Sequence, residues 1–328
     1  MSVLVTGASG QIGRFLVSEL LDSGHDVVAF DVRFDQELLD KAKINDKLKL
    51  IYGDLADIEE LLNTIKKYNV ERIIHLAALV LLESRARPLK AAKVNIMGAL
   101  NVFEAARLMD LKRVVYASSE AVLGSPTNYN LKLINEDVHP LTPPDPYPIS
   151  KFVNEAFGTF YREAYGIDII GSRLTSVWGP GRYTGYTGQF NNFLRELIIN
   201  GTAKVPEDFA YINAKLRWLY VKDGARAFAH IALVEKSKIR RSVYNVGSKK
   251  AWNIIDMINI IKELLPNAKI DFMPLNKPTD TSSRIPGPAG LEVDCSRLYE
   301  ELGFEEKYGL RGGLLDMINY ERTRINKI

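Results

Sequence analysis

The sequence predicts an α/β fold with a doubly wound parallel sheet, on two observations. The first half of the chain alternates short runs rich in Val, Ile and Leu with amphipathic segments of helical length. The first of these runs also leads directly into a glycine-rich turn at residues 6–13 and then into a helical segment. Continuous apolar runs are typical of strands that are buried on both faces of a parallel sheet, and helices join such strands by right-handed crossovers.

The same alternation gives the expected elements of the first half. We expect strands at residues 3–6, 27–31, 48–52, 72–76 and 113–117, and helices at 11–24, 57–68 and 91–109. Strand–helix alternation of this kind indicates a Rossmann-like sheet with helices on both of its faces.

The second half has a different character. Residues 125–148 are rich in Pro, Asn and Asp, which predicts a long loop, and the Gly-, Tyr- and Thr-rich run 179–188 predicts a mobile loop. Beyond the first loop we expect a helix from near 147, further helices at 190–200, 223–235, 253–265 and 296–302, and strands at 167–174, 218–221, 243–246 and 270–273. This half is expected to be a smaller α/β region that covers the carboxyl ends of the sheet.

Composition narrows the function classes. The 328 residues carry a net charge of only +3, with Lys and Arg interspersed among Asp and Glu, so we expect no nucleic-acid partner. No apolar run reaches the roughly 20 residues that span a bilayer, so we expect no membrane insertion and a cytoplasmic enzyme. The single cysteine and four scattered histidines predict neither a disulfide nor a metal site.

A dinucleotide site is predicted at the glycine-rich turn. Gly7, Gly10 and Gly13 lie directly after the first strand, where glycine lets the backbone approach a pyrophosphate at a helix N-terminus. Asp31 ends the second strand, where a carboxylate accepts hydrogen bonds from the adenosine ribose and repels a 2′-phosphate. We therefore expect NAD rather than NADP as the cofactor, although Arg33 could weaken the preference. Asp54 and its apolar neighbour Leu55 follow the third strand, where they could bracket the adenine.

A catalytic pair is predicted at the start of the helix near residue 147. Tyr147 and Lys151 lie one helical turn apart, hence on one face. A nearby ammonium group, together with the positive nicotinamide, would favour the phenolate and move the pKa of Tyr147 towards neutral. The tyrosine could then act as the base in alcohol oxidation and as the acid in the reverse step. Ser119, at the end of the fifth strand, supplies a hydroxyl for the substrate oxygen.

We divide the chain accordingly into two regions. Residues 1–175 are expected to form the NAD-binding domain that carries the catalytic residues, and residues 176–328 the substrate-binding region, with a possible return of the chain to the main sheet around 216–250.

Taken together, these motifs resemble those of the extended short-chain dehydrogenase/reductase family, also called the NAD-dependent epimerase/dehydratase family. The matches run over nearly the whole chain: residues 6–13, Asp31, Asp54, 75–78, 94–95, 118–119, Tyr147 with Lys151, Arg173, 178–180, 244–247 and a closing helix at 294–304.

The resemblance assigns roles to these residues. It implies that Tyr147 is the base, that Lys151 orients it and holds the nicotinamide ribose, and that Ser119 is the catalytic hydroxyl. The residues implied at the cofactor are Gly7, Ser9, Gly10, Gln11, Ile12, Gly13, Asp31, Asp54, Leu55, Leu76, Ala77, Ala78, Asn95, Tyr147 and Lys151. His75 is expected to lie near the cofactor without acting as a catalyst. A homodimer through the helices after Arg87 and Tyr147 is also implied.

Departures from the family pattern concern the substrate. Nucleotide-sugar 4,6-dehydratases have an Asp/Glu pair where this chain has Glu120 and Ala121, so we expect no 4,6-dehydration. Leu216 occupies the place of an arginine that binds the diphosphate in many epimerases, with Arg217 one position away. Ser176 and Leu123 replace a usual Asn and Tyr. Arg284 matches a second phosphate-contacting arginine.

Three functions remain open on the sequence. The first is a nucleotide-sugar epimerase, and the second is a dehydrogenase of a small hydroxy compound, as in the short-chain-type L-threonine dehydrogenases. The third is a catalytically silent NAD sensor. For both enzyme functions the substrate is expected to be a small molecule, and the residues expected to contact it are Ser119, Glu120, Ser176, Arg182, Arg217 and Arg284.

Overall fold

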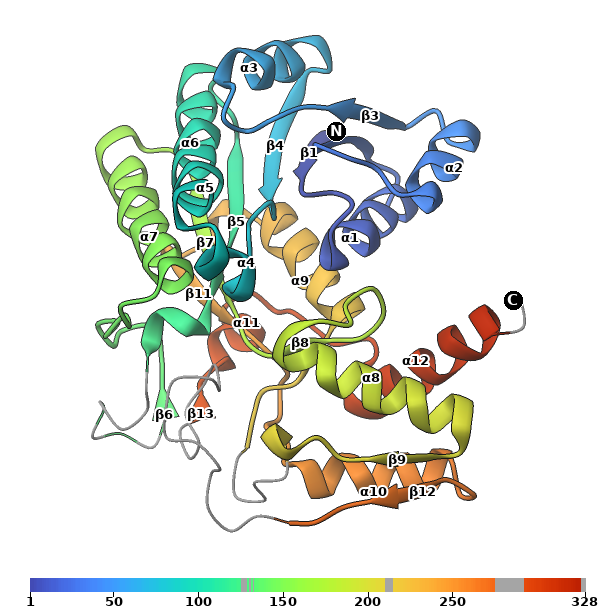
Figure 1. Ribbon diagram of the computed structural model, residues 1–328. Helices are drawn as coiled ribbons and strands as arrows, with labels where there is room; N and C mark the ends of the chain where they lie inside the picture. Colours follow the sequence, from blue (N-terminus) through green and yellow to red (C-terminus); the bar gives the residue numbers. More distant parts are fainter. Residues whose placement is uncertain (125–128, 130, 132, 210–214, 275–291, 326–328) are drawn as a thin grey trace.

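A parallel sheet of seven strands lies at the centre of the molecule, in the order β11-β7-β5-β4-β1-β2-β3 (Figure 1). The computed structural model describes residues 1–124, 129, 131, 133–209, 215–274 and 292–325. The strands are β1 (Ser2–Thr6), β2 (Asp26–Asp31), β3 (Leu48–Tyr52), β4 (Val70–His75), β5 (Arg113–Ser119), β7 (Ile169–Leu174) and β11 (Val243–Val246). Every neighbouring pair is parallel, which confirms the predicted doubly wound α/β fold.

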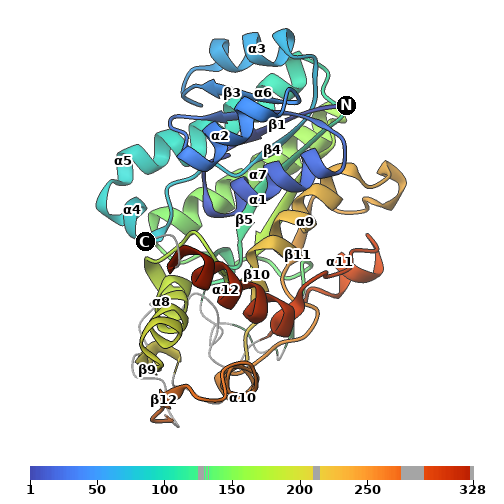
Figure 2. The same ribbon diagram turned by 90° about the vertical axis from the view of Figure 1, so that its right-hand side faces the viewer.

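Helices cover both faces of this sheet (Figures 1 and 2). The helices α1 (Gln11–Asp22) and α9 (Val221–Leu233) pack on one face, and α3 (Ile58–Lys67), α6 (Gly98–Leu108) and α7 (Pro146–Tyr165) pack on the other. Successive side chains of a strand point to opposite faces, so Val3 and Val5 of β1 join the first core and Leu4 joins the second. Alternate residues of the strand thus contribute to two separate apolar clusters, one on each face of the sheet.

The strand order reverses between β1 and β4, and this position organises the site. A crevice forms at the carboxyl ends of the strands at such a reversal, and ligands bind there in doubly wound folds. The loop that follows β1 and the loop that follows β4 approach each other closely here. A Cβ atom on Gly7 would lie 2.6 Å from the amide nitrogen of Ala77. Gly7 also has a φ of +67°, so a larger residue is excluded twice over.

The C-terminal region lies beyond the carboxyl ends of the strands, where α8 (Gly185–Asn200), α10 (Ile254–Leu264) and α12 (Gly309–Ile325) gather (Figure 1). α12 packs against α8 and α10 (Figure 2). Most of the run 179–188, predicted to be a mobile loop, belongs instead to the start of α8 or is held by side-chain hydrogen bonds described below.

The remaining elements are short. They are α2 (Gln36–Ile44), α4 (Leu81–Ala86), α5 (Pro88–Ala91), a π-helical turn (Ala92–Met97), 3-10 turns (Glu120–Leu123, Glu207–Phe209, Lys236–Lys238), α11 (Ser296–Glu300), and the strands β6 (Leu133–Ile134), β8 (Val177–Trp178), β9 (Thr202–Lys204), β10 (Leu219–Tyr220), β12 (Lys269–Asp271) and β13 (Glu292–Val293). The single helix expected at 91–109 is thus interrupted by the π-helical turn. The helices α2, α4 and α12 and the strands β6, β9 and β13 were not among the expected elements.

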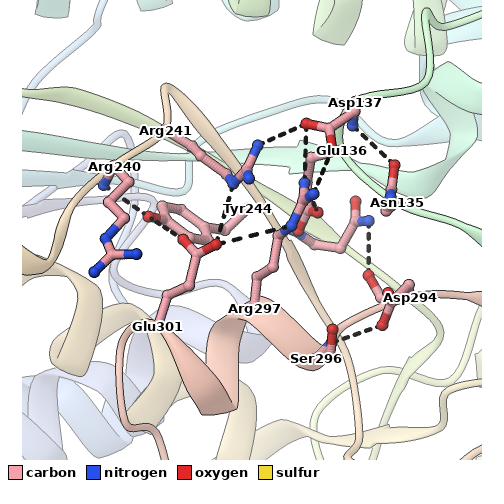
Figure 3. A network of polar contacts seen from close by, with 11 residues as sticks. Asn135, Glu136, Asp137, Arg240, Arg241, Tyr244, Asp294, Ser296, Arg297 and Glu301 are labelled. Carbon is pink, nitrogen blue, oxygen red and sulfur yellow. Dashed lines mark hydrogen bonds and ion pairs between the residues drawn. The ribbon is translucent and has the colours of Figure 1, made fainter.

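A polar network joins the segment after β6 to β11 and α11 (Figure 3). Arg297 of α11 donates a hydrogen bond to Glu136 Oε2 at 2.9 Å and forms an ion pair with Asp137. The other oxygen of Glu136 accepts the backbone N–H of Asn245 at 2.8 Å. Burial raises the pKa of Glu136, while the bonds from Asn245 and Arg297 oppose that rise. These contacts fix α11 and the β6 segment against the edge strand of the main sheet.

Candidate active site

The glycine-rich turn between β1 and α1 has the shape of a cradle for a phosphate group. A Cβ atom on Gly13 would lie 2.3 Å from the carbonyl oxygen of Gly7, so the turn closes only with glycine. Gly10 is the N-cap residue of α1 and has no side chain to cap the first turn. Ser9 Oγ is buried and has no hydrogen-bond partner among the described residues. A pyrophosphate fits these donors, because a helix N-terminus presents unpaired N–H groups and a partial positive charge.

Asp31 is held at the end of β2 beside this turn. Its Oδ2 accepts the backbone N–H of Ser9 at 3.0 Å, and its Oδ1 accepts that of Arg33 at 3.4 Å. Within the described residues, the Arg33 side chain makes no ion pair with Asp31, and Arg14 pairs instead with Asp35 at 3.0 Å. The carboxylate therefore remains a hydrogen-bond acceptor at the position expected for an adenosine ribose.

The two predicted adenine contacts differ in burial. Asp54 is exposed, and its carboxylate accepts the backbone N–H of Ala56 at 3.0 Å. Leu55 is 6% exposed and packs in the core beneath α6. On the other side of the crevice, Leu76 donates its N–H to Thr6, and the partly buried Ala77 lies directly beside Gly7, followed by the partly buried Ala78.

Asn95 lies in the π-helical turn and connects two parts of the site. Its side chain accepts the N–H of Leu79 at 2.8 Å and donates to the carbonyl of the same residue at 2.9 Å. It also donates to Ser150 Oγ at 3.2 Å, and its own carbonyl accepts a bond from Asn154. Asn95 is thus a buried link between the chain after β4 and α7. π-Helical turns occur frequently at functional sites, because they displace a side chain from the regular register.

Tyr147 and Lys151 lie in the first turns of α7, as predicted. Asp145 caps this helix by accepting the N–H of Tyr147 at 3.1 Å, and Pro146 occupies the first turn. Lys151 is 2% exposed, and its Nζ donates to the carbonyl of Ala117 at 2.8 Å. The same Nζ lies 5.6 Å from the centroid of the Tyr147 ring. The Ser119 side chain lies close enough to the Tyr147 hydroxyl to lower its pKa, so the structure brings all three predicted catalytic residues together.

The electrostatics of this pair differ from the expectation. Burial raises the pKa of Tyr147, and the hydrogen bond from Ser119 and the charge of Arg182 only partly oppose it. The expected shift towards neutral is therefore wrong for the protein groups alone. Burial also lowers the pKa of Lys151 to about 8, against the opposing charge of Glu155. Loss of contact with water disfavours the charged form of each group, but with a pKa of about 8 Lys151 is still largely an ammonium group at pH 7.

An ion pair that we did not predict lies behind Lys151. Arg173 of β7 binds Glu155 of α7 with two hydrogen bonds, at 2.9 and 2.8 Å, and both side chains are nearly inaccessible. Ser118 Oγ also donates to Glu155, at 2.5 Å. The alternation of β5 thus sends Ser118 to this buried pair and Ser119 to Tyr147. The available signal was the spacing of Glu155, one helical turn after Lys151.

The predicted substrate contacts fall into two groups. Glu120 and Ser176 are buried and hydrogen-bonded to each other at 3.3 Å, and Arg182 lies close enough to Tyr147 to lower its pKa. Arg217 instead donates to the backbone carbonyls of Val293 and Ser248, both at 3.1 Å, and its third nitrogen pairs with Glu292.

Three further positions were singled out in the sequence. Leu216 is 7% exposed and forms an antiparallel bridge with Trp252, so its side chain belongs to the core. Arg284 lies outside the described residues. His75 is buried, hydrogen-bonded to Thr6 Oγ1 at 2.7 Å, and neutral, because burial lowers its pKa to about 3. This state agrees with its expected non-catalytic position.

The loop between β8 and α8 is attached on three sides. Gln11 of the glycine-rich turn donates to the carbonyl of Gly179 at 3.1 Å. Asn191 of α8 binds both the N–H and the carbonyl of Gly179, at 3.0 and 2.9 Å. The Tyr183 hydroxyl is hydrogen-bonded to Glu321 of α12. This loop, which carries Arg182, therefore connects the nucleotide cradle with the C-terminal helix.

Two findings in the described part of the chain concern metal sites and membrane spans. No cluster of three or more His, Cys, Asp or Glu side chains there could hold a metal ion. No helix among the same residues is long and apolar enough for a membrane span.

Comparisons with known proteins agree with this geometry. The model of the NAD dependent epimerase/dehydratase family matches residues 3–247. The UDP-glucose 4-epimerase of Mycolicibacterium smegmatis is 34% identical over 329 residues, which cover 99% of each chain. The structure of a UDP-glucose 4-epimerase from Thermotoga maritima, solved with UDP-glucose, has a TM-score of 0.80 at 25% identity and covers 99% of this chain and 100% of that one. An L-threonine dehydrogenase from Clostridium difficile has a TM-score of 0.83 at 22% identity, covering 98% of each chain, which concerns the fold alone.

Proposed function

Because the chain belongs to the NAD-dependent epimerase/dehydratase family, we propose that it is a nucleotide-sugar epimerase that uses NAD to invert a carbinol carbon of a UDP-sugar. The predicted family, the NAD cofactor and the Rossmann-like fold are confirmed. The observation that carries the substrate class is the 34% identity with a UDP-glucose 4-epimerase over the full length of both chains.

The residues around the glycine-rich turn would hold the cofactor. The first turn of α1 and Ser9 would bind the pyrophosphate, and Asp31 would accept from the adenosine ribose hydroxyls. Lys151 would hold the nicotinamide ribose. NAD, when bound there, would supply the hydride acceptor for oxidation of the carbinol carbon and the hydride donor for the reverse reaction.

The chain's own residues would move the proton. Tyr147 would take the hydroxyl proton of the substrate as the hydride leaves and give it back in the reverse step. Ser119, which lies close enough to the same phenol to lower its pKa, would orient the substrate oxygen. The ammonium group of Lys151 would stabilise negative charge on the phenol from the same face of α7.

We also propose that 4,6-dehydration is not catalysed. That elimination needs both an acid and a base beside the catalytic hydroxyl. This chain offers the carboxyl of Glu120, but Ala121 at the next position has only a methyl group.

A second candidate is a dehydrogenase of a small hydroxy compound such as threonine. The observation that favours it is that neither residue at the position of the expected diphosphate-binding arginine is free to bind a diphosphate. Leu216 is buried in a β-bridge, and all three nitrogens of the neighbouring Arg217 are bound within the protein. A small substrate needs no diphosphate site. The catalytically silent NAD sensor is disfavoured by the assembled Ser119, Tyr147 and Lys151.

One experiment separates these functions. The purified protein is freed of bound nucleotide, supplied with catalytic NAD, and incubated with UDP-galactose in one arm and with L-threonine and excess NAD in the other. The epimerase predicts formation of UDP-glucose without net NADH, whereas the dehydrogenase predicts NADH from L-threonine only. Formation of neither product, with NAD bound, would leave the sensor as the better proposal.

We propose a homodimer in the cytoplasm. Large apolar side chains are exposed along α7 (Ile149, Phe157 and Phe160) and along α5 to α6 (Leu89, Met97 and Leu108). Packing two copies of these helices would bury both rows in one four-helix contact. Sedimentation of the wild type and of Phe157→Asp should give a dimer and a monomer. A wild-type monomer would refute the proposal.

A further inference from the structure

A buried carboxyl group stands directly after Ser119. Glu120 begins the 3-10 turn Glu120–Leu123 and is 7% exposed. Its Oε1 accepts a hydrogen bond from Ser176 Oγ at 3.3 Å. Within the described residues, this is the only hydrogen bond of the carboxyl, and no Lys or Arg side chain forms an ion pair with it.

Such a group is stable inside a protein only when it carries a proton. An ionised carboxylate that is removed from water and left without a cation is costly, and the group takes up a proton instead. Burial raises the pKa of Glu120 to about 8, while the bond from Ser176 opposes the rise. At neutral pH the free oxygen is therefore an O–H donor rather than an acceptor.

The surroundings of Glu120 belong to the catalytic centre. Glu120 directly follows Ser119, and its charge would raise the pKa of Tyr147 on α7, of Tyr186 on α8 and of Cys295 before α11. Other charges also act on these neighbours: Arg182 on Tyr147, Asp208 on Tyr186, and Arg217, Glu136 and Asp294 on Cys295. The carboxyl therefore lies beside Ser119 and within electrostatic reach of Tyr147.

We propose that Glu120 is a specificity residue whose carboxyl O–H donates a hydrogen bond to an oxygen on the carbon next to the reacting carbinol. It thereby selects substrates with vicinal oxygens, as in a sugar ring, over plain alcohols. The choice of a UDP-sugar as the probe rests on the proposed function, whereas the donor role of the carboxyl does not.

Two consequences follow from this role. When Glu120 loses its proton, the donor disappears and the new negative charge opposes ionisation of Tyr147. Substrate affinity therefore falls as the pH rises through about 8. A glutamine at this position keeps an N–H donor of similar shape but does not titrate.

The test compares the kinetics of UDP-galactose epimerisation by the wild type, Glu120→Gln and Glu120→Ala between about pH 6 and about pH 10. The control is Glu306→Gln, which removes a partly buried carboxyl of raised pKa, bonded to Tyr299 and Lys249 outside the site. We expect KM to rise above about pH 8 in the wild type and the control but to stay level in Glu120→Gln. At pH 7, Glu120→Ala should raise KM roughly tenfold, with a smaller change in kcat. Unchanged KM in Glu120→Ala, even with lower thermal stability, would overturn the proposal.

A second readout needs no turnover. The infrared difference spectrum of wild type minus Glu120→Gln should contain the carbonyl band of a protonated carboxyl at pH 7. If no UDP-sugar reacts, the proposed function fails, but the proposal for Glu120 can still be tested. Presence of this band would support it, and absence of the band would contradict it. Oxidation of L-threonine that is abolished in Glu120→Gln would also overturn it, because the carboxylate form would then bind the vicinal ammonium group.

Discussion

Removal of the charge of Glu155 should destabilise the protein far more than removal of a surface charge. The substitution Glu155→Gln keeps the size of the side chain but leaves the guanidinium of Arg173 without a counter-ion. Arg173 and Glu155 side chains are 4% and 7% exposed, so water cannot replace the lost carboxylate. One guanidinium nitrogen of Arg173 already lacks a partner within the described residues.

The magnitude follows from this burial. Removing one partner of a buried ion pair costs about 3–5 kcal/mol, because the remaining charge stays uncompensated. The bond from Ser118 Oγ, at 2.5 Å, loses its charged acceptor as well. A domain has about 5–15 kcal/mol of stability in total, so the variant should lose a large fraction of it.

The assay is urea unfolding followed by fluorescence and circular dichroism at pH 7, with Glu263→Gln as the matched control. Glu263 pairs with Arg311, and both side chains are 60% exposed. An exposed pair of this kind contributes less than about 1 kcal/mol. The double variant Glu155→Gln/Arg173→Met should recover part of the loss, because it removes the unpaired charge. A loss below about 1 kcal/mol in Glu155→Gln, equal to that of the control, would refute the reasoning from burial.

Three further predictions concern the catalytic helix and the cofactor. Tyr147→Phe should lower turnover by roughly 10²–10⁴-fold with NAD affinity nearly unchanged, and retention of more than about a tenth of the activity would exclude this base. Asp31 should make NAD bind at least about tenfold tighter than NADP in titration calorimetry, and equal affinities would contradict that role. Lys151→Met should stabilise the fold at pH 7, because it removes an ammonium group that is costly to bury. The lowering of the pKa from the ordinary 10.5 to about 8 corresponds to a cost of about 3 kcal/mol, and loss of the hydrogen bond to Ala117 offsets about 1 kcal/mol of the gain. The native state binds fewer protons than the unfolded state between about pH 8 and 10.5, so this gain in the free energy of unfolding should vanish as the pH rises through that window.

The fold was predictable where burial leaves a strong local pattern. Strands β1 to β5 lie between two cores, so their apolar runs identified them from the sequence alone. The helix α2 was not predicted because only Leu38 is buried in it, and so few apolar residues give a weak helical period. The helix α12 packs against α8 and α10, which are remote from it in the sequence. The local sequence of α12 therefore does not predict that contact.

The candidate site divides in the same way. The glycine-rich turn and the pair Tyr147 and Lys151 are local motifs, so their spacing alone located them. The bond between Glu120 and Ser176 joins the ends of two strands, and a sequence cannot reveal such a pairing or the burial that keeps the carboxyl protonated. Arg217 was expected near the substrate on its charge, but its partners come from β13 and the chain after β11.

The edge strand β11 is synthesised after all the other strands of the main sheet, which affects folding on the ribosome. The nascent chain produces β1 to β7 well before α9 and β11, so for a time α1 lacks its packing partner and β7 exposes an unpaired edge. An open edge of this kind recruits other strands, and an uncovered apolar face attracts chaperones. Folding should therefore be completed only after Val246 has left the exit tunnel, and a ribosome stalled before that point should hold a chain that is sensitive to protease.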